Sequence, residues 1–167
     1  MEKGTIFVTL IFLAVIVLPF ALTGYSRRKT KNGLFRQLSQ LAGNEHGAIS
    51  QHEFSSNFVI GLDEATNHLY FYKEMNKQKL ARQVDLNSFR SCRLLTTSRT
   101  VGEGKERLLV IDKLELCFYP LDKSGPVEVV EVYNTEYDSL TLTGELQLAE
   151  KWEALLNERL RPLRKTA

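Results

Sequence analysis

The chain has 167 residues, 43% of them hydrophobic, with 22 basic against 20 acidic side chains and a formal net charge of +2 at pH 7. The length suits one domain of ordinary size beside a terminal segment, and the sequence shows no internal repeat. Charge is divided unevenly, because residues 37–156 carry twelve cations against eighteen acids, whereas residues 25–36 carry five cations and no acid. An acidic folded region argues against nucleic-acid binding, which needs a basic stripe on the surface.

The N-terminal run from Thr5 to Thr23 contains no charged residue and consists mostly of Ile, Leu, Val, Phe and Ala. At about 1.5 Å per helical residue, such a run covers roughly the 30 Å hydrocarbon core of a bilayer, so it predicts a transmembrane helix. A cleaved signal peptide is the alternative and would make the protein an exported binding domain. Signal peptides have shorter apolar cores, however, and end at a small-residue cleavage site rather than in a basic cluster.

A basic cluster follows the apolar run directly and predicts its orientation. Cations that flank a span stay on the cytoplasmic side, and the other flank offers only Lys3 beside Glu2. We therefore predict a single-pass protein of the inner (cytoplasmic) membrane whose folded part faces the cytosol. The membrane-orienting residues are Arg27, Arg28, Lys29 and Lys31.

This interpretation divides the chain into four segments. Residues 1–25 form the transmembrane anchor, and residues 26–45 form a basic juxtamembrane segment with a short helix. Residues 46–161 form an antiparallel sheet with a C-terminal helix, and residues 162–167 form a basic tail. The short helix is predicted because apolar residues recur at helical spacing from Leu34 to Ala42, before Gly43.

Beyond that helix the apolar period changes to two, which is typical of strands. The first two strands read as a hairpin with Phe58, Ile60 and Leu62 on one face. No helix separates the strands, so parallel crossovers are excluded and the sheet should be antiparallel. The predicted strands are residues 57–63, 67–73, 81–86, 89–97, 106–120 and 126–134.

The chain ends in a predicted amphipathic helix that covers about residues 143–160. Its apolar stripe includes Trp152, Thr143 is placed as the N-cap, and Pro162 follows its end. Such a helix can close the open end of a curled sheet, which would bury Trp152 against Leu114 and Leu116. The predicted fold class is therefore α+β, with a curled antiparallel sheet or barrel closed by the helix.

The two cysteines fit a reducing compartment, in which a structural disulfide is not expected. Cys92 shares a strand face with Leu94 and should point inward. Cys117 alternates with Leu114, Leu116 and Phe118 and should point outward, so a bridge between the two cysteines is not predicted.

The stretches VIGLDEATNHLYFY, QVDLNSFRSCRLL, IDKLELCFY and YDSLTLTGELQLAEKW resemble a group of uncharacterised bacterial proteins. Each of those proteins has one N-terminal span and a domain similar to the pleckstrin-homology-like (PH-like) barrel. The resemblance covers nearly the whole chain and implies a binding or scaffolding platform without a catalytic residue. It also implies seven strands where six are evident, and ISQHEF can supply the seventh.

Two weak motifs are better explained as ordinary structure. VGEGKER contains a Gly-x-Gly and a lysine, but phosphate loops join a strand to a helix, whereas here both flanks are strands, so a hairpin turn is favoured. His46, His52 and His68 lie near acidic residues but lack the spacing of a metal site, and we expect surface histidines. No cofactor and no metal are predicted.

The connection between the last strand and the helix is unusually rich in hydrogen-bonding and aromatic groups. In the preferred interpretation the tyrosines cover the mouth of the barrel while Asp138 and Ser139 make local turn bonds. The alternative is a recognition surface for a protein or peptide. The residues of this candidate partner surface are Tyr133, Asn134, Glu136, Tyr137 and Asp138.

Taken together, the sequence predicts a membrane-anchored, non-catalytic interaction module that contacts the bilayer through its N-terminal helix. The competing hypothesis is a membrane-bound hydrolase that uses Asp63, Glu64 and Asp112. Carboxylates at turns and on strand surfaces are usually solvated, so this hypothesis requires a pocket that gathers them with shifted pKa values.

Overall fold

The structure, a computed structural model, describes residues 28–44, 47–75, 78–102, 107–122 and 124–161, and the backbone of residues 162–166. The predicted class is confirmed, because two helices accompany two antiparallel sheets. Residues 28–43 are helical, and β1 (Gln51–Phe54), β2 (Phe58–Asp63), β3 (His68–Met75) and β4 (Gln78–Asp85) follow. A 3-10 turn, η1 (Leu86–Ser88), leads into β5 (Phe89–Val101), β6 (Leu108–Pro120) and β7 (Glu128–Asn134), and α2 (Glu145–Thr166) ends the described chain.

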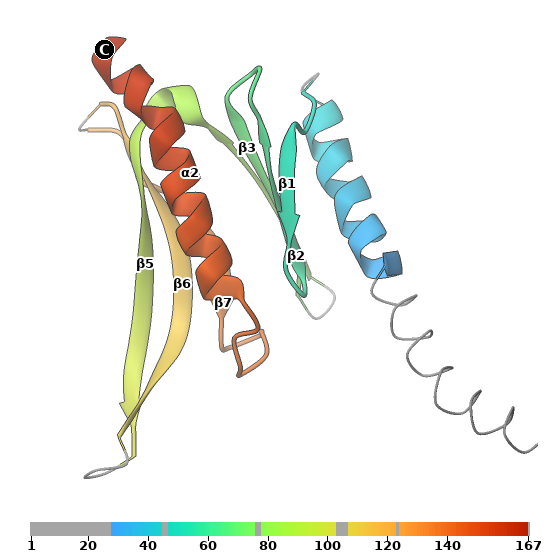
Figure 1. Ribbon diagram of the computed structural model, residues 1–167, viewed down its shortest axis with the longest axis vertical. Helices are drawn as coiled ribbons and strands as arrows, with labels where there is room; N and C mark the ends of the chain where they lie inside the picture. The colour runs from blue at the N-terminus through green and yellow to red at the C-terminus, as the bar shows by residue number, and fades with distance from the viewer. Residues whose placement is uncertain (1–27, 45–46, 76–77, 103–106, 123, 167) are drawn as a thin grey trace, which may run out of the picture.

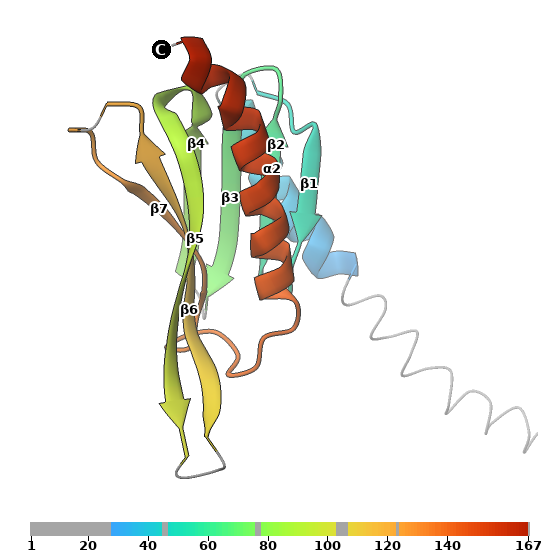
Figure 2. The same cartoon turned by 60° about the vertical axis from the view of Figure 1, so that its left-hand side comes forward.

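Seven strands are present, and the seventh is β1, which confirms the prediction that ISQHEF supplies a strand. The strand orders are β1-β2-β3-β4 in one sheet and β5-β6-β7 in the other, with every pair antiparallel. The predicted closed barrel is wrong, because no strand of one sheet pairs with the other within the described residues. The physical reason is that α2 lies between the edge strands β1 and β5 (Figures 1 and 2). Its side chains bind both strands, through Trp152 to Glu53 and through Asn157 to Cys92.

The four-stranded sheet is covered on both faces. One face contributes Phe58, Ile60, Leu62, Leu69 and Phe71 to a core shared with β5–β7 and α2. The other face packs Val59, Tyr70 and Tyr72 against Leu34, Leu38 and Ala42 of the N-terminal helix. The layers therefore run in the order β5–β7 sheet, β1–β4 sheet, helix 28–43, with α2 beside the first two (Figure 1).

Burial of Trp152 is confirmed: its side chain is 1% exposed and belongs to the same core cluster as Leu114 and Leu116. The indole Nε1 donates a hydrogen bond of 3.1 Å to Glu53 Oε2 on β1, so the polar end of the ring is also satisfied. This contact joins α2 to the edge of the four-stranded sheet.

Both predicted ends of the last helix are wrong. Thr143 is not the N-cap, because the helix begins at Glu145 and Thr143 instead donates from its backbone N–H and hydroxyl to the Glu145 carboxylate. Gly144 between them has a φ of +121°, a conformation that favours glycine. The helix also continues through Pro162 to Thr166, although a proline leaves the carbonyl of Glu158 without its helical partner. The predicted tail of residues 162–167 is thus helical as far as residue 166.

Cys92 points inward as predicted and is 1% exposed. Cys117 lies on the face opposite Leu116 and Phe118, as predicted, but its side chain is nevertheless only 3% exposed. It sits in the central strand of its sheet between Arg93 and Val129, where longer neighbours surround a small thiol. Both cysteines are free.

Replacement of Trp152 by alanine should destabilise the domain by about 3–5 kcal/mol, because it empties a large buried site and removes the bond to Glu53. Chemical denaturation measures the loss, and the native tryptophan fluorescence of the parent should be that of a buried indole. The neighbouring Glu150→Ala, at an exposed position of the same helix, is the control and should change little. An unchanged denaturation midpoint for Trp152→Ala, together with a tryptophan emission of the parent that is typical of an indole in water, would contradict the packed helix.

Candidate interaction surfaces

The predicted partner segment is organised around a buried lysine. Lys73, at the end of the inward-facing series on β3, is 0% exposed. Its Nζ lies 2.6 Å from Asp138 Oδ2, donates to the Val132 carbonyl at 3.0 Å and lies 5.2 Å from the ring centre of Tyr137. A buried ammonium is tolerated only with such partners, so the connection is tied to the sheet by charge.

Asp138 serves several donors at once. Besides Lys73, it accepts hydrogen bonds from Asn57 Nδ2 at 2.6 Å and from the Asn134 backbone N–H at 2.8 Å. Tyr133 donates its hydroxyl to the Ser139 carbonyl at 2.8 Å. The connection between β7 and α2 is therefore folded back on itself and fastened to the β2 and β3 strands.

This placement decides which residues of the candidate partner surface can meet a partner. Tyr133 and Asn134 are buried, and the Asp138 side chain is 5% exposed. Tyr137 is half-buried, and Glu136 is exposed. The geometry thus resembles the preferred interpretation of internal turn bonds, whereas a recognition role stays a prediction for Glu136 and Tyr137.

Sequence reasoning missed Lys73 and Asn57, which hold the segment in place. A signal for Lys73 exists, because Leu69, Phe71 and Lys73 alternate on one face and the first two are buried. Nothing local marks Asn57 or indicates that Asp138 is the partner of Lys73 from 65 residues away.

The three carboxylates of the hydrolase hypothesis have different environments. Asp63 is 2% exposed and binds backbone N–H groups of Ala48, Ala65 and Thr66. Burial alone would raise its pKa, but these hydrogen bonds outweigh burial and hold the pKa below its ordinary value. Glu64 is exposed in the following turn.

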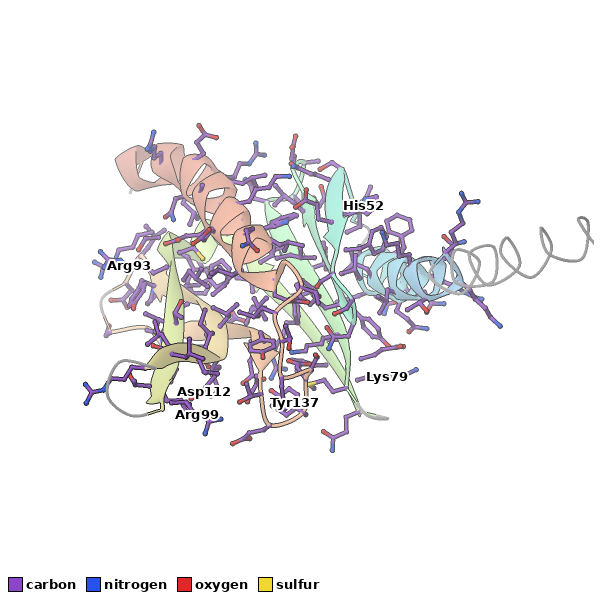
Figure 3. All side chains as sticks on the ribbon, turned by 60° about the horizontal axis from the view of Figure 1, so that its bottom comes forward. His52, Lys79, Arg93, Arg99, Asp112 and Tyr137 are labelled. Atoms are coloured by element: carbon purple, nitrogen blue, oxygen red, sulfur yellow. The ribbon has the colours of Figure 1, made fainter. Side chains whose placement is uncertain are left out.

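Asp112 lies on β6, where its Oδ1 is 3.0 Å from Arg99 Nε. That oxygen is buried yet receives no well-directed hydrogen bond, so the contact is an ion pair of poor geometry. Figure 3 shows Arg99 and Asp112 together on the ribbon, far from His52 on the other side of the molecule. These carboxylates are anchors of local structure rather than one constellation.

The predicted weak motifs fall on ordinary elements. His52 is exposed on β1, with its ring centre 4.5 Å from that of Phe35, and His68 Nδ1 lies 2.9 Å from the Thr66 carbonyl oxygen. His46 lies outside the described residues. Over the ranges that the structure describes, no three His, Cys, Asp or Glu side chains are grouped as metal ligands. The Gly-x-Gly motif joins β5 to β6, so its flanks are strands, as predicted.

An open hollow lies where β1 meets the N-terminal helix and the start of α2, with a volume of about 660 Å³. Lys31 extends over it, with Nζ 5.6 Å from the Phe54 ring centre. A second hollow of about 420 Å³ shares Lys31, Phe54 and Leu148 with the first and adds Lys151, which is paired with Glu53. The remaining residues that line the first hollow are Thr30, Ser55, Ser56, Thr143 and Gly144.

A third hollow, of about 590 Å³, lies between α2 and β5. Asn157 stands in it and binds the β5 backbone: its Oδ1 accepts from the Cys92 N–H at 3.1 Å, and its Nδ2 donates to the Cys92 carbonyl at 2.7 Å. Burial raises the pKa of the Cys92 thiol, so this cysteine is a poor nucleophile. Asn157 is therefore a structural residue that no sequence pattern revealed.

The predicted membrane-orienting residues stand at the start of the described chain. Arg28, Lys29 and Lys31 are exposed on the first turn of the helix that packs on the sheet, and Arg27 lies outside the described residues. The predicted span also lies outside them. None of the helices in the described part of the chain is long and apolar enough to cross a membrane.

The Lys73–Asp138 pair predicts an asymmetric response to substitution. Asp138→Asn leaves a buried ammonium without its counter-charge and should cost about 3–5 kcal/mol of unfolding free energy. Lys73→Met should cost less, because Asp138 keeps Asn57 and the Asn134 N–H as donors. The double variant should therefore cost less than the sum of the single ones in a denaturation series, and additive losses would contradict the coupling. Glu136→Gln, exposed on the same connection, is the control.

Asp63 and Glu145 should make stability depend on pH. For Glu145, too, burial alone would raise the pKa, but hydrogen bonds from Thr143 and Ser55 prevail and lower it. Folded carboxyls with lowered pKa values bind protons less readily than unfolded ones, so their stabilisation is present near neutral pH and is lost as pH falls below about 4. Denaturation midpoints between pH 7 and pH 3 should fall less steeply for Asp63→Asn than for the parent, whereas Glu64→Gln at the exposed neighbouring position should follow the parent.

Comparison with known proteins identifies no relative of this chain. No protein-family model matches the chain, and no curated protein sequence or solved structure is significantly similar to it.

Proposed function

We propose that the protein is a membrane-anchored interaction module of the inner membrane that presents its folded domain to the cytosol and carries out no catalysis. The charge-free run from Thr5 to Thr23 and the cations that follow it support this proposal. PH-like architecture belongs to the same proposal, and the division of seven strands into four and three before a C-terminal helix supports it.

The observation that carries the proposal is the packing of the helix that starts at the basic cluster. Leu34, Leu38 and Ala42 are at most 1% exposed against the four-stranded sheet. The segment after the proposed anchor is thus part of the folded domain rather than a loose tether. Attachment through this segment keeps the domain near the bilayer, and confinement at one membrane raises the effective concentration of any partner there.

The hollow beside Lys31 is the surface of this module that lies closest in sequence to the proposed anchor. It combines an aromatic ring, a cation and several hydroxyl groups on three different elements. Such a mixture suits a polar segment of a protein or peptide better than an apolar small molecule. The hydrolase alternative gains no support, because Asp63 is committed to backbone N–H groups and Asp112 to Arg99.

Cell fractionation tests the anchoring. The full chain should remain in the membrane pellet after an alkaline wash, and a variant that lacks residues 1–27 should move to the soluble cytosolic fraction while keeping its denaturation midpoint. Recovery of the truncated form from membranes would contradict the proposed anchor. Recovery of a shortened, soluble form of the full chain outside the cytosol would support the signal-peptide alternative instead.

Orientation is tested in the same strain with a C-terminal reporter enzyme that is active only outside the cytosol. The parent should be inactive, and Glu substitutions of Arg27, Arg28, Lys29 and Lys31 together should raise the exported fraction, because they remove the cytoplasmic positive charge. Matched Glu substitutions at Lys79 and Arg161, two exposed cations far along the chain from the span, are the control.

A further inference from the structure

The β5–β6 hairpin extends beyond its own sheet. Both strands have 13 residues, whereas β7 pairs only with Lys113–Phe118 of β6. Residues 98–101 and 108–112 therefore form a two-stranded ribbon that projects from the body, at the lower left of Figure 1. Leu95, just before this ribbon, and Val101 and Leu108 on it are 46%, 47% and 69% exposed. Two-stranded ribbons are marginally stable in water and gain from a third strand.

The outer edge of β5 has two different halves. Near its start, Asn157 satisfies both backbone groups of Cys92, so the helix takes the place of a neighbouring strand there. Backbone groups alternate in direction along a strand, so those of Thr96, Ser98 and Thr100 point to the same outer edge as those of Cys92. Residues 95–101 are all exposed, and within the described chain no strand pairs with this edge.

The edge is continuous, which makes it a template for another strand. The irregularity between Thr97 and Ser98 arises because Asp112 of β6 is the extra residue, so β5 itself skips no position. The stretch from Leu95 to Val101 contains no proline or glycine and one charged side chain, and long edges of this kind pair with other chains unless they are protected.

We propose that β5 pairs antiparallel with β5 of a second copy of this chain, about a two-fold axis through Ser98. In this register Leu95 faces Val101 of the other copy, Thr96 faces Thr100, and Thr97 faces Arg99. The two half-exposed apolar side chains thus cover each other on one face, and threonines pair on the other.

Neighbouring registers are worse for identifiable reasons. A two-fold axis perpendicular to the sheet preserves its faces, so the axis must pass through one residue. An axis at Thr97 sets both Leu95 and Val101 opposite arginines, and an axis at Thr96 sets Arg93 opposite Arg99. An axis at Arg99 brings the two arginines together. Only the Ser98 register joins apolar to apolar and keeps like charges apart.

How much of the protein pairs rests on the proposed function. Seven paired residues bury less than a standard interface does, so pairing is expected chiefly where anchoring concentrates the protein.

Cysteine cross-linking of the full chain in membranes tests the register. Opposed residues of a hydrogen-bonded antiparallel pair have Cα atoms about 5.5 Å apart, within disulfide range, so Ser98→Cys should give a product of doubled mass under mild oxidation. Thr96→Cys should not, because the two copies of residue 96 would lie about 13 Å apart along the strands. Thr96→Cys combined with Thr100→Cys should cross-link again. The parent is the background control, since its two cysteines are buried.

A charge exchange gives an independent test at exposed positions that are not needed for folding. Leu95→Lys with Val101→Lys, introduced together with Ser98→Cys, should abolish the cross-linked product. Leu95→Lys with Val101→Glu should restore it, because opposite charges then face each other in this register alone. Ser98→Cys alone and the two charged variants are also compared in detergent solution at raised protein concentration, where anchoring plays no part.

The outcomes separate the two proposals. Three results would each overturn the self-pairing. The first is equal cross-linking of Ser98→Cys and Thr96→Cys, and the second is loss of the product from both the Lys/Lys and the Lys/Glu variants. The third is a cross-linked product with another protein in place of the doubled mass. Absence of the full chain from the membrane fraction, together with Ser98→Cys dimers in detergent, would reject the anchor and keep the pairing. Dimers in neither setting, with the chain in membranes, would reject the pairing and keep the anchor.

Discussion

One buried ion pair determines how the two sheets and the last helix fit together. Lys73 belongs to the four-stranded sheet, and its ammonium binds both the Val132 carbonyl of the other sheet and Asp138 of the connection to α2. Because an unpaired charge in the core is far more costly than any other side chain there, the connection can adopt only conformations that return Asp138 to this place. Once Asp138 is bound there, Asn57 binds Asp138 while the adjacent Ser55 and Ser56 bind Glu145, which is the first residue of α2.

The same constraint explains why a segment rich in tyrosine and carboxylate is not a free surface. Tyr133, Asn134 and Asp138 of the predicted partner surface are the residues whose polar groups bind within the connection and to the ion pair. Buried polar networks that are fully satisfied give a loop one conformation at the expense of its availability to partners. Attention then moves to other surfaces, the hollow beside Lys31 and the outer edge of β5.

Local patterns predicted the elements well, because periodicity reports burial directly. The alternation of Phe58, Ile60 and Leu62 and the helical stripe around Trp152 both occupy the core. Closure of the barrel was not predictable, since it depends on what binds the outer edge of β5. That edge could have paired with another strand, but at Cys92 it binds the side chain of Asn157. The partner of Lys73 was equally hidden, because Asp138 is distant in the sequence and a lysine at a strand end is usually solvated. Pro162 misled because a proline can weaken or kink a helix without ending it.

The position of α2 between two sheet edges has a consequence for biosynthesis. The edges of β1 and β5 and the surroundings of Trp152 are complete only when α2 is present, and α2 is synthesised after every strand that it contacts. Domains synthesised from their N-terminus expose unpaired strands until the missing part arrives. Folding of this domain is therefore completed by the helix rather than by the sheets.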